Sequence, residues 1–403
     1  MPNPDSQSSA SSSVGEPVGV TPRGLLSGEA SGADASAPAS SLRDMHELFK
    51  RAFEQGASDI HLTENCPPIL RIHGDLQPTG LPVLSRADTK RLIYSVLTDR
   101  QRAIFEREQE LDMSLEVKGL GRFRINVHLQ RGSVEAAFRL VPMNIRSLEE
   151  LGLPPVVAEL TRRPNGLVLV TGPTGVGKTT TLAAMVDQIN RERSQLVIVI
   201  EDPMEYVHKN RRAVIKQREV YSDTQSFPKA LVRAMRQDPD VIVVGEMRDL
   251  ETISTALTAA ETGHLVLATL HTPDASQTID RILDVFPPYQ QQQVKIQLAD
   301  CLQGVISQQL LSRRDAPGRI VAYEIMIATT AVRALIRDHA TEQLLTVLQT
   351  GRQYGMCTMD AKIKELYDEG LITLETAMSR VKNPAEFQLL GKPGLKKRRW
   401  TDR

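Results

Sequence analysis

The sequence has few cysteines, and they lie far apart. Cys66, Cys301 and Cys357 form no CxxC pair, which argues against a structural zinc site and against a disulfide-stabilised scaffold. We therefore expect a reducing compartment, the cytoplasm. The first residues also lack the basic and apolar segments of a secretory signal.

Long apolar runs and a net charge are missing as well. The longest runs, such as Leu265–Leu270, have the length of a strand, whereas crossing a bilayer takes about 18 or more apolar residues. We expect a soluble protein with peripheral membrane association at most. The 49 basic and 49 acidic residues cancel, and the chain has no basic, aromatic-rich stretch of the kind that lines a nucleic-acid channel. These features count against a nucleic-acid partner and a nucleic-acid translocase.

Composition and periodicity divide the first part of the chain into three segments. Residues 1–41 are dominated by Ser, Ala, Gly and Pro without an aromatic residue, and we predict a disordered tail. Residues 42–147 are predicted to form a small α+β domain, and residues 148–156 a linker rich in Gly and Pro. The elements expected in this domain are helices at Asp44–Gln55 and Arg86–Leu97 and strands at Asp59–Leu62, Ile69–His73, Arg122–Leu129 and Val134–Val141.

The second part has a different pattern. Within residues 157–328, four apolar runs alternate with helical stretches: Leu167–Val170, Val197–Ile200, Val241–Val244 and Leu265–Leu270. Continuous apolar runs are typical of parallel strands buried on both faces, so we predict an α/β domain. Residues 329–387 are predicted to be helical. Residues 388–403 form a basic tail, in which Lys396–Arg399 and Trp400 either contact anionic lipid or remain a solvated terminus.

The strongest motif is a phosphate-binding loop. Gly172-Pro-Thr-Gly-Val-Gly177-Lys178-Thr179 matches GxxxxGK[ST], with an apolar strand before it and a helix at Thr180–Asn190 after it. Backbone N–H groups and the helix dipole would hold the phosphates, Lys178 would neutralise them, and the Thr179 hydroxyl would hold Mg²⁺. We therefore predict ATP and Mg²⁺ as ligands, bound by Gly172, Pro173, Thr174, Gly175, Val176, Gly177, Lys178, Thr179 and Thr180.

Two acidic clusters follow predicted strands. Val241–Val244 runs into Glu246, as in a Walker B element with Glu in the acidic position, and Val197–Ile200 runs into a segment that includes Glu205. Because the carboxyl ends of parallel strands meet at one edge of a sheet, we expect both clusters near the γ-phosphate. The alternative is that these carboxylates are solvated loop residues.

Two histidines flank the last apolar run. His264 and His271 are seven residues apart, an odd step that directs them to opposite faces of a strand. They are therefore expected to have different roles. His271, at the carboxyl end, is positioned to sense the γ-phosphate or to contact a neighbouring subunit, whereas His264 is expected to serve in packing or at an interface.

Taken together, these segments resemble the retraction ATPases of type IV pili, the twitching motility proteins of the secretion-ATPase superfamily. The resemblance covers roughly residues 42–387 and implies a homohexameric ring whose subunits combine a PAS-like N-terminal domain with a RecA-like motor domain. The segments that carry it are Ala57–Leu62, Gly172–Thr180, Ile200–Tyr206, Gln237–Val241, Gly245–Asp249, Glu261–His264 and Ala268–His271.

The resemblance also implies roles for individual residues. Glu205 corresponds to the general base that activates the attacking water, and Glu246 to the Walker B carboxylate that holds Mg²⁺ through water. Arg124 and Arg139 match the arginines that reach the phosphates from the N-terminal domain; such arginines are worth about 10³–10⁵ in rate. The alternative is that both are surface arginines of strands.

Departures from the family pattern bear on the physiological role. The absence of a paired-cysteine zinc motif favours retraction over pilus assembly or type II secretion. The helix Ala331–Asp338 keeps the pattern of a retraction-branch helix with three substitutions, and its Arg333 and Arg337 hint at a partner contact. Expected partners are an inner-membrane pilus platform protein, contacted at the cytoplasmic face of the inner membrane, and a paralogous retraction ATPase. An accessory paralogue that acts mainly through partner binding is the alternative.

Overall fold

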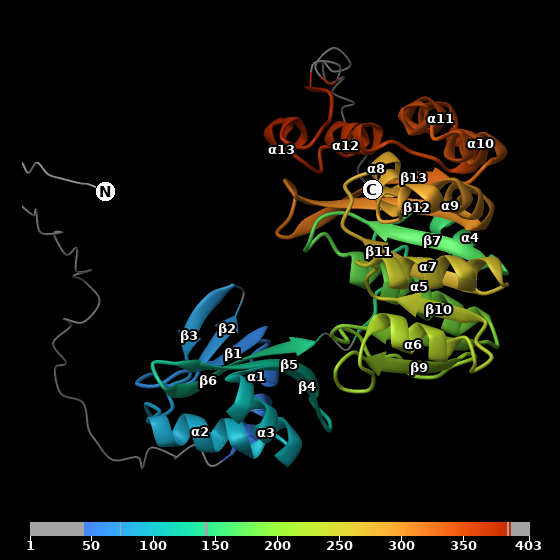
Figure 1. Cartoon of the computed structure of the whole chain (residues 1–403). Helices are drawn as coiled ribbons and strands as arrows, with labels where there is room; N and C mark the ends of the chain where they lie inside the picture. Colours follow the sequence, from blue (N-terminus) through green and yellow to red (C-terminus); the bar gives the residue numbers. More distant parts are fainter. Residues whose placement is uncertain (1–43, 73, 142–143, 385–386, 388–403) are drawn as a thin grey trace, which may run out of the picture. The chain divides into compact units, whose positions relative to one another are not determined.

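The computed structural model describes residues 44–72, 74–141, 144–384 and 387 (Figure 1). The predicted tails, residues 1–41 and 388–403, lie outside the described residues. Within these residues the strands form two sheets, one of six strands and one of seven. None of the described helices is both long and apolar enough to span a bilayer.

The N-terminal domain is an antiparallel sheet whose strand order is β3-β2-β1-β6-β5-β4. Its helices supply Phe49, Leu92 and Phe105 to a single core with strand residues such as Phe123 and Phe138. The rings of Phe49 and Phe123 lie 4.3 Å apart. The elements are α1 Met45–Glu54, β1 Asp59–Leu62, β2 Ile69–Ile72, β3 Asp75–Pro78, α2 Arg86–Ser95, α3 Asp99–Glu108, β4 Glu110–Val117, β5 Gly121–Gln130 and β6 Ser133–Val141.

The larger domain has a mixed sheet in the order β13-β12-β7-β11-β10-β8-β9. All neighbouring strands run parallel except the edge pair β12 and β13. Its elements are α4 Pro155–Thr161, β7 Gly166–Thr171, α5 Lys178–Glu192, β8 Leu196–Glu201, β9 Val214–Glu219, α6 Phe227–Ala234, β10 Val241–Val244, α7 Leu250–Glu261, β11 Leu265–Leu270, α8 Ala275–Asp284, α9 Pro288–Cys301, β12 Leu302–Ser312 and β13 Arg319–Ile327.

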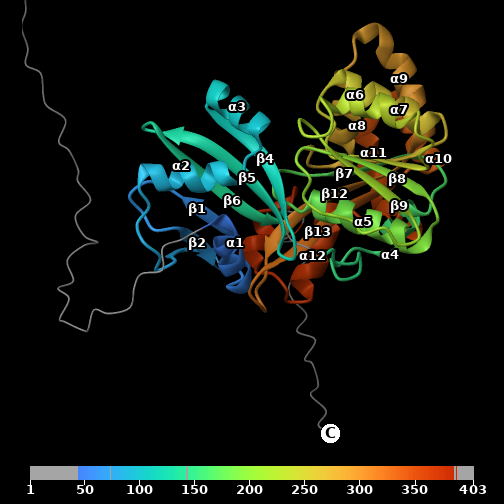
Figure 2. The same cartoon turned by 90° about the horizontal axis from the view of Figure 1, so that it is seen from below.

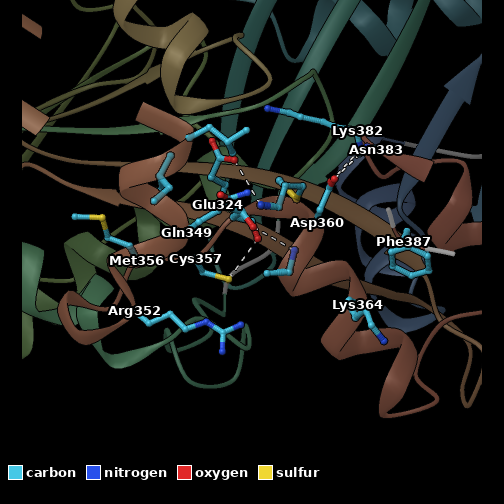
Figure 3. Close-up of a pocket in the computed structure, with 15 residues that line it drawn as sticks. Glu324, Gln349, Arg352, Met356, Cys357, Asp360, Lys364, Lys382, Asn383 and Phe387 are labelled. Atoms are coloured by element: carbon cyan, nitrogen blue, oxygen red, sulfur yellow. Dashed lines mark hydrogen bonds between the residues drawn. The ribbon is translucent and has the colours of Figure 1, made fainter. Parts of the chain in front are cut away.

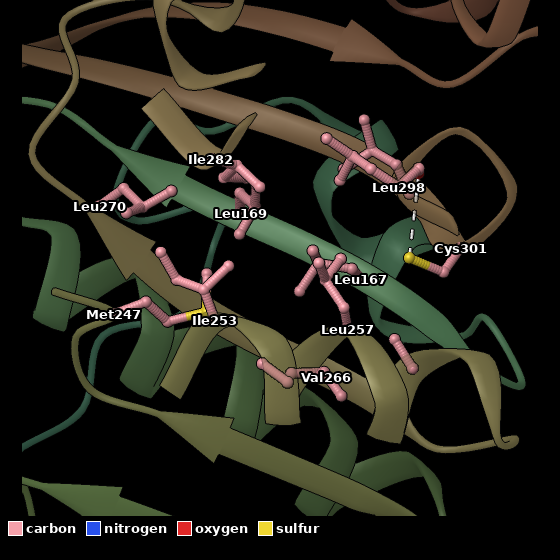
Figure 4. Close-up of a cluster of buried hydrophobic side chains, with 14 of the residues drawn as sticks. Leu167, Leu169, Met247, Ile253, Leu257, Val266, Leu270, Ile282, Leu298 and Cys301 are labelled. Atoms are coloured by element: carbon pink, nitrogen blue, oxygen red, sulfur yellow. Dashed lines mark hydrogen bonds between the residues drawn. The ribbon is translucent and has the colours of Figure 1, made fainter. Parts of the chain in front are cut away.

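The central strands bury both of their faces. Successive side chains of a strand point to opposite sides, so in β7 Leu167 and Leu169 join one core cluster and Val168 and Val170 join the other. Helices α6, α7, α8 and α9 complete the first cluster, and α4 and α5 complete the second, on the other side of the sheet (Figure 2). Figure 4 shows part of the first cluster, around Leu167 and Leu169. Burial on both faces explains why these strands are uniformly apolar.

Helices follow the edge hairpin of β12 and β13. They are α10 Thr330–Asp338, α11 Leu344–Thr350, α12 Met359–Asp368 and α13 Leu374–Met378, which agrees with the helical content predicted there. In α10, Val332 and Ile336 are buried in the first core cluster. Arg333 donates hydrogen bonds to the carbonyls of Ala299 and Asp300, at the end of α9. The arginine therefore has a structural role inside the chain.

Candidate active site

The phosphate-binding loop joins β7 to α5 in a conformation that needs glycine. Gly172, Gly175 and Gly177 have φ angles of +136°, +82° and +91°, a region that side chains strongly disfavour. At Gly172 there is also no room for a side chain, because an added Cβ would lie 2.5 Å from the carbonyl oxygen of Gln308 in β12. The predicted loop is therefore packed directly against its neighbouring strand.

The helix after the loop begins without a side-chain cap. Gly177 is the N-cap of α5, and within this fully described segment no side chain accepts a hydrogen bond from the first turn. The free N–H groups and the positive end of the helix dipole therefore point into the loop, an arrangement that binds an anion. Helices α6, α7 and α8 differ, since Ser226, Asp249 and Asp274 cap them.

Lys178 is buried at the start of α5, with 8% of its surface exposed. Its Nζ donates to the carbonyl oxygens of Gly172 at 2.7 Å and Pro173 at 3.0 Å. Burial lowers the pKa of Lys178, and the negative charges of Glu246 and Glu205 act in the opposite direction. The ammonium group therefore lies within the field of both predicted carboxylates.

Glu246 follows β10 and is held by two neighbours. Its Oε1 lies 2.7 Å from Nε2 of His271, and Nη2 of Arg248 donates to its Oε2 at 2.7 Å. Burial acts to raise the pKa of Glu246, but the hydrogen bonds of Arg248 and the charge of His271 hold it below its usual value. Nδ1 of His271 is 3.4 Å from Nζ of Lys178, so the structure brings the loop, Glu246 and His271 together.

Glu205 lies in the connection between β8 and β9. Its side chain is exposed, whereas the preceding Met204 is buried. The next residue, Tyr206, shares a hydrogen bond of 3.0 Å with Thr180 of the phosphate-binding motif. The segment that carries Glu205 is therefore joined to the first turn of α5.

These groups line one cleft with a volume of about 730 Å³. The lining includes Thr174 to Thr180, Glu205, Glu246 and His271. It continues along the 146–153 segment and the β12–β13 hairpin, where Arg146, Leu151, Leu153, Leu310, Arg313 and Val321 also line it. The cleft is large enough for a nucleotide, since small-molecule sites usually measure about 300–1,000 Å³.

The two arginines expected to reach the phosphates lie in different places. Arg124 lines the cleft. Burial raises the pKa of Asp202, and the positive charges of Arg248 and Arg124 oppose this rise. Nε of Arg139 instead donates to Asp59 at 2.8 Å, and 69% of its side chain is exposed. Among the described residues, Arg139 is not part of the cleft lining.

His264 is separate from this site. Its Nδ1 lies 2.9 Å from the carbonyl oxygen of Ala259, near the end of α7. His264 therefore contacts the end of a helix, whereas His271 contacts Glu246.

A second cavity, of about 540 Å³, lies beside α11 and α12 (Figure 3). Its buried Glu324 accepts hydrogen bonds from the N–H groups of Ala275 at 2.9 Å and Met359 at 3.5 Å. Lys382 donates to Asp274 at 2.8 Å. Glu324, Asp274 and Lys382 therefore have hydrogen-bond partners within the chain.

Some pairings and pKa shifts in and around the cleft could not be predicted from the sequence. Arg248 was part of a matching segment, but its pairing with Glu246 had no sequence indication. The buried Glu201 lines the cleft, and burial and the negative charge of Glu205 raise its pKa to about 8. Gln217 and Glu219 of β9 bind the segment around Glu205.

The strand order and the cleft define the class of the protein. The phosphate-binding loop follows β7, β11 separates β7 from the carboxylate strand β10, and α5 begins with an uncapped turn. This is a RecA-like P-loop nucleotide-binding domain, joined to a PAS-like N-terminal domain.

The chain belongs to the type II/IV secretion system protein family. The sequence model of that family matches residues 34–380. It is 47% identical over 344 residues to the type IV pilus retraction ATPase PilT of Pseudomonas aeruginosa, covering 85% of this chain and 100% of that protein. Identity to the type IV pilus ATPase PilU of the same organism is 36%, over 87% of this chain and 92% of that protein.

A solved structure has the same fold. The crystal structure of the pilus retraction motor PilT with bound ADP superposes with a TM-score of 0.82 and 50% identity, over 86% of this chain and 99% of that chain. The ATPase DotB of Legionella pneumophila is more distant, with a TM-score of 0.70 and 26% identity, over 83% of this chain and 94% of that chain. Both predicted domains therefore have counterparts in a known architecture.

Proposed function

We propose that this chain is an ATP-hydrolysing motor that drives the retraction of type IV pili. The observation that carries the proposal is the 47% identity to a retraction ATPase over that protein's whole length. The cleft supplies the groups that such an activity needs, namely an anion-binding loop, an ammonium group and two carboxylates.

Each group of the cleft has a task in hydrolysis. The loop amides and Lys178 bind the phosphates and stabilise negative charge on them. Glu205, whose carboxylate is exposed in the cleft, accepts the proton of the attacking water. Such general-base assistance typically contributes 10²–10⁴ in rate.

Mg²⁺ fits the donor set of Thr179 and Glu246, since hydroxyl and carboxylate oxygens are the ligands that it prefers. A bound Mg²⁺ would neutralise charge on the transferred phosphoryl group. In the structure Glu246 is paired with Arg248 and His271, so these two residues keep its carboxylate ionised. His271 is also positioned to respond to the γ-phosphate through Lys178.

Arg124 is the better candidate for the arginine that reaches the phosphates, because it lines the cleft. Arg139 would have to leave its ion pair with Asp59 to take part. The active form is a homohexamer that acts on an inner-membrane pilus platform protein from the cytoplasmic side.

Two alternatives differ in the process that is driven. An accessory ATPase, working with a paralogous motor, corresponds to the 36% identity to PilU. An assembly or secretion ATPase corresponds to 31% identity to a type II secretion protein of Pseudomonas aeruginosa. Retraction is favoured because identity to PilT exceeds both.

Deleting the gene and imaging the pili tests this proposal. Cells with more pili that do not retract are expected, and complementation with the wild-type gene, but not with Lys178→Ala, should restore retraction. Cells without pili would contradict retraction and favour assembly. A strain that still retracts normally would favour the accessory role.

A further inference from the structure

The segment that carries Glu205 has little regular structure of its own. It leaves β8 after Glu201 and returns at β9, and the residues from 203 to 210 form neither helix nor strand. Within the described chain, no hydrogen bond to the Glu205 carboxylate is recorded, and its side chain is exposed. The position of this carboxylate is therefore set by what binds the backbone on either side of it.

Strand β9 provides two of these contacts through Gln217. Its Nε2 donates to the carbonyl oxygen of Tyr206 at 2.7 Å, and its Oε1 accepts from the N–H of His208 at 2.8 Å. One amide side chain thus satisfies a backbone acceptor and a backbone donor of the same segment. A glutamine is suited to this because it carries both kinds of group.

Glu219, two residues further along β9, binds the other side of Glu205. Its Oε2 accepts from the N–H of Met204 at 3.3 Å. Residues two apart on a strand face the same side, so both side chains reach the segment from one face of β9. Glu219 is 3% exposed, and Arg122 donates to it at 2.6 Å, which balances its charge.

A third contact links the segment to the phosphate-binding motif. The hydroxyl of Tyr206 lies 3.0 Å from the hydroxyl of Thr180. Since Thr180 belongs to the first turn of α5, this contact relates Glu205 to the place where the phosphates are expected.

We propose that Gln217 and Glu219 are positioning residues, which hold the backbone on both sides of Glu205 and so fix its carboxylate against the phosphate-binding loop. The proposal rests on the proposed role of Glu205 as general base. It predicts that loosening these contacts slows hydrolysis without weakening nucleotide binding, since neither residue belongs to the phosphate-binding motif. A displacement of about 1 Å can cost up to about 10²-fold in rate.

The test compares full-length wild-type protein with Gln217→Met, which keeps the length of the side chain and removes both polar groups. We expect kcat for MgATP to fall roughly 10- to 100-fold, with KM and the Kd of a fluorescent ADP analogue unchanged within about twofold. Gln293→Met is the matched control, because Gln293 is exposed on α9, and it should keep wild-type kcat.

A double variant separates positioning from a general structural role. If Gln217 acts through Glu205, Gln217→Met should reduce kcat no further in a Glu205→Gln background, because residues that act as a unit are not additive. An independent structural effect would reduce kcat by the same factor in both backgrounds, and this result would overturn the proposal.

The two proposals fail in different ways. If Glu205→Gln alone keeps wild-type kcat, the general-base assignment is wrong. If Glu205→Gln is slow but Gln217→Met has normal kcat, only the positioning proposal is wrong. Should Gln217→Met not fold, Gln217→Glu keeps an acceptor for the N–H of His208 and removes the donor to the carbonyl oxygen of Tyr206. Its kcat should fall about two- to tenfold, and an unchanged kcat would overturn the proposal.

Discussion

Replacing Gly172 with alanine tests how tightly the phosphate-binding loop is built into the sheet. The new Cβ would lie 2.5 Å from the carbonyl oxygen of Gln308 and 2.9 Å from Cγ2 of Val176. The Gln308 backbone has little freedom to move, because its strand β12 pairs with both β7 and β13. The loop itself must therefore shift.

The expected loss of stability has two parts. A non-glycine residue at a φ of +136° is strained by about 1–3 kcal/mol, and overpacking adds about 1–3 kcal/mol. Gly175→Ala is the matched control, since Gly175 also has a positive φ, +82°, but a Cβ there would meet nothing within 4 Å. Gly172→Ala should therefore be less stable than Gly175→Ala by about the overpacking contribution, 1–3 kcal/mol.

Denaturant unfolding of the nucleotide-free variants, followed by circular dichroism, measures this difference. Nucleotide is left out because its binding would stabilise the variants unequally. Equal free energies of unfolding for the two alanine variants would refute the reasoning, since they would mean that β12 does not restrict the loop.

Three further predictions concern catalysis, pH and the α9–α10 contact. Glu205→Gln should lower MgATP turnover by about 10²–10⁴ while the Kd for ADP stays within about twofold; weakened ADP binding would make Glu205 a binding residue. Burial lowers the pKa of His208 to about 4, below its value near 6.5 in the unfolded chain. Because the unfolded state therefore takes up a proton first as the pH falls, the stability that neutral His208 contributes above pH 6.5 is lost progressively toward pH 4. Between pH 7 and 5 the wild type should lose about 2 kcal/mol more unfolding free energy than His208→Gln, and parallel pH profiles would contradict this. Arg333→Met should destabilise the chain by about 1–3 kcal/mol in denaturant unfolding, because carbonyl groups at the end of α9 lose their hydrogen-bond donor. Arg337→Met breaks only an exposed ion pair and should cost less than about 1 kcal/mol. Equal losses would contradict this explanation.

In the larger domain, the strands predicted from the sequence are those with two buried faces. The predicted run Leu167–Val170 matches β7 to within one residue at each end, and Leu265–Leu270 matches β11. Such strands are apolar at every position, which local composition reveals.

The larger domain's strands with polar or exposed positions were missed, whereas β5 of the N-terminal domain was predicted from its alternating pattern. In β12 the buried Ser307 and Gln308 interrupt the apolar run; they bond to Thr171 of β7 and to Thr181 of α5. β9 lies at an edge, and its sequence is mostly polar. Helix α3 was missed because Phe105 is its one buried residue among those described. For β12 the stabilising contacts are distant in the sequence.

The active site, too, combines features that are local in the sequence with contacts that form only in space. The phosphate-binding loop could be predicted because its residues are contiguous and their spacing follows from the geometry of the turn. The pairing of Glu246 with His271, and of Gln217 with the Glu205 segment, depends on how neighbouring strands meet in space. No local sequence pattern predicts these contacts.

The central claim is that Lys178 and the loop around it form an ATP-hydrolysing site. The most direct measurement is MgATP turnover by the purified full-length chain and by Lys178→Ala, with circular dichroism to establish that both are folded. We expect turnover by the wild type and none above background by the variant, with the same circular dichroism spectrum. Wild-type turnover by folded Lys178→Ala would contradict it.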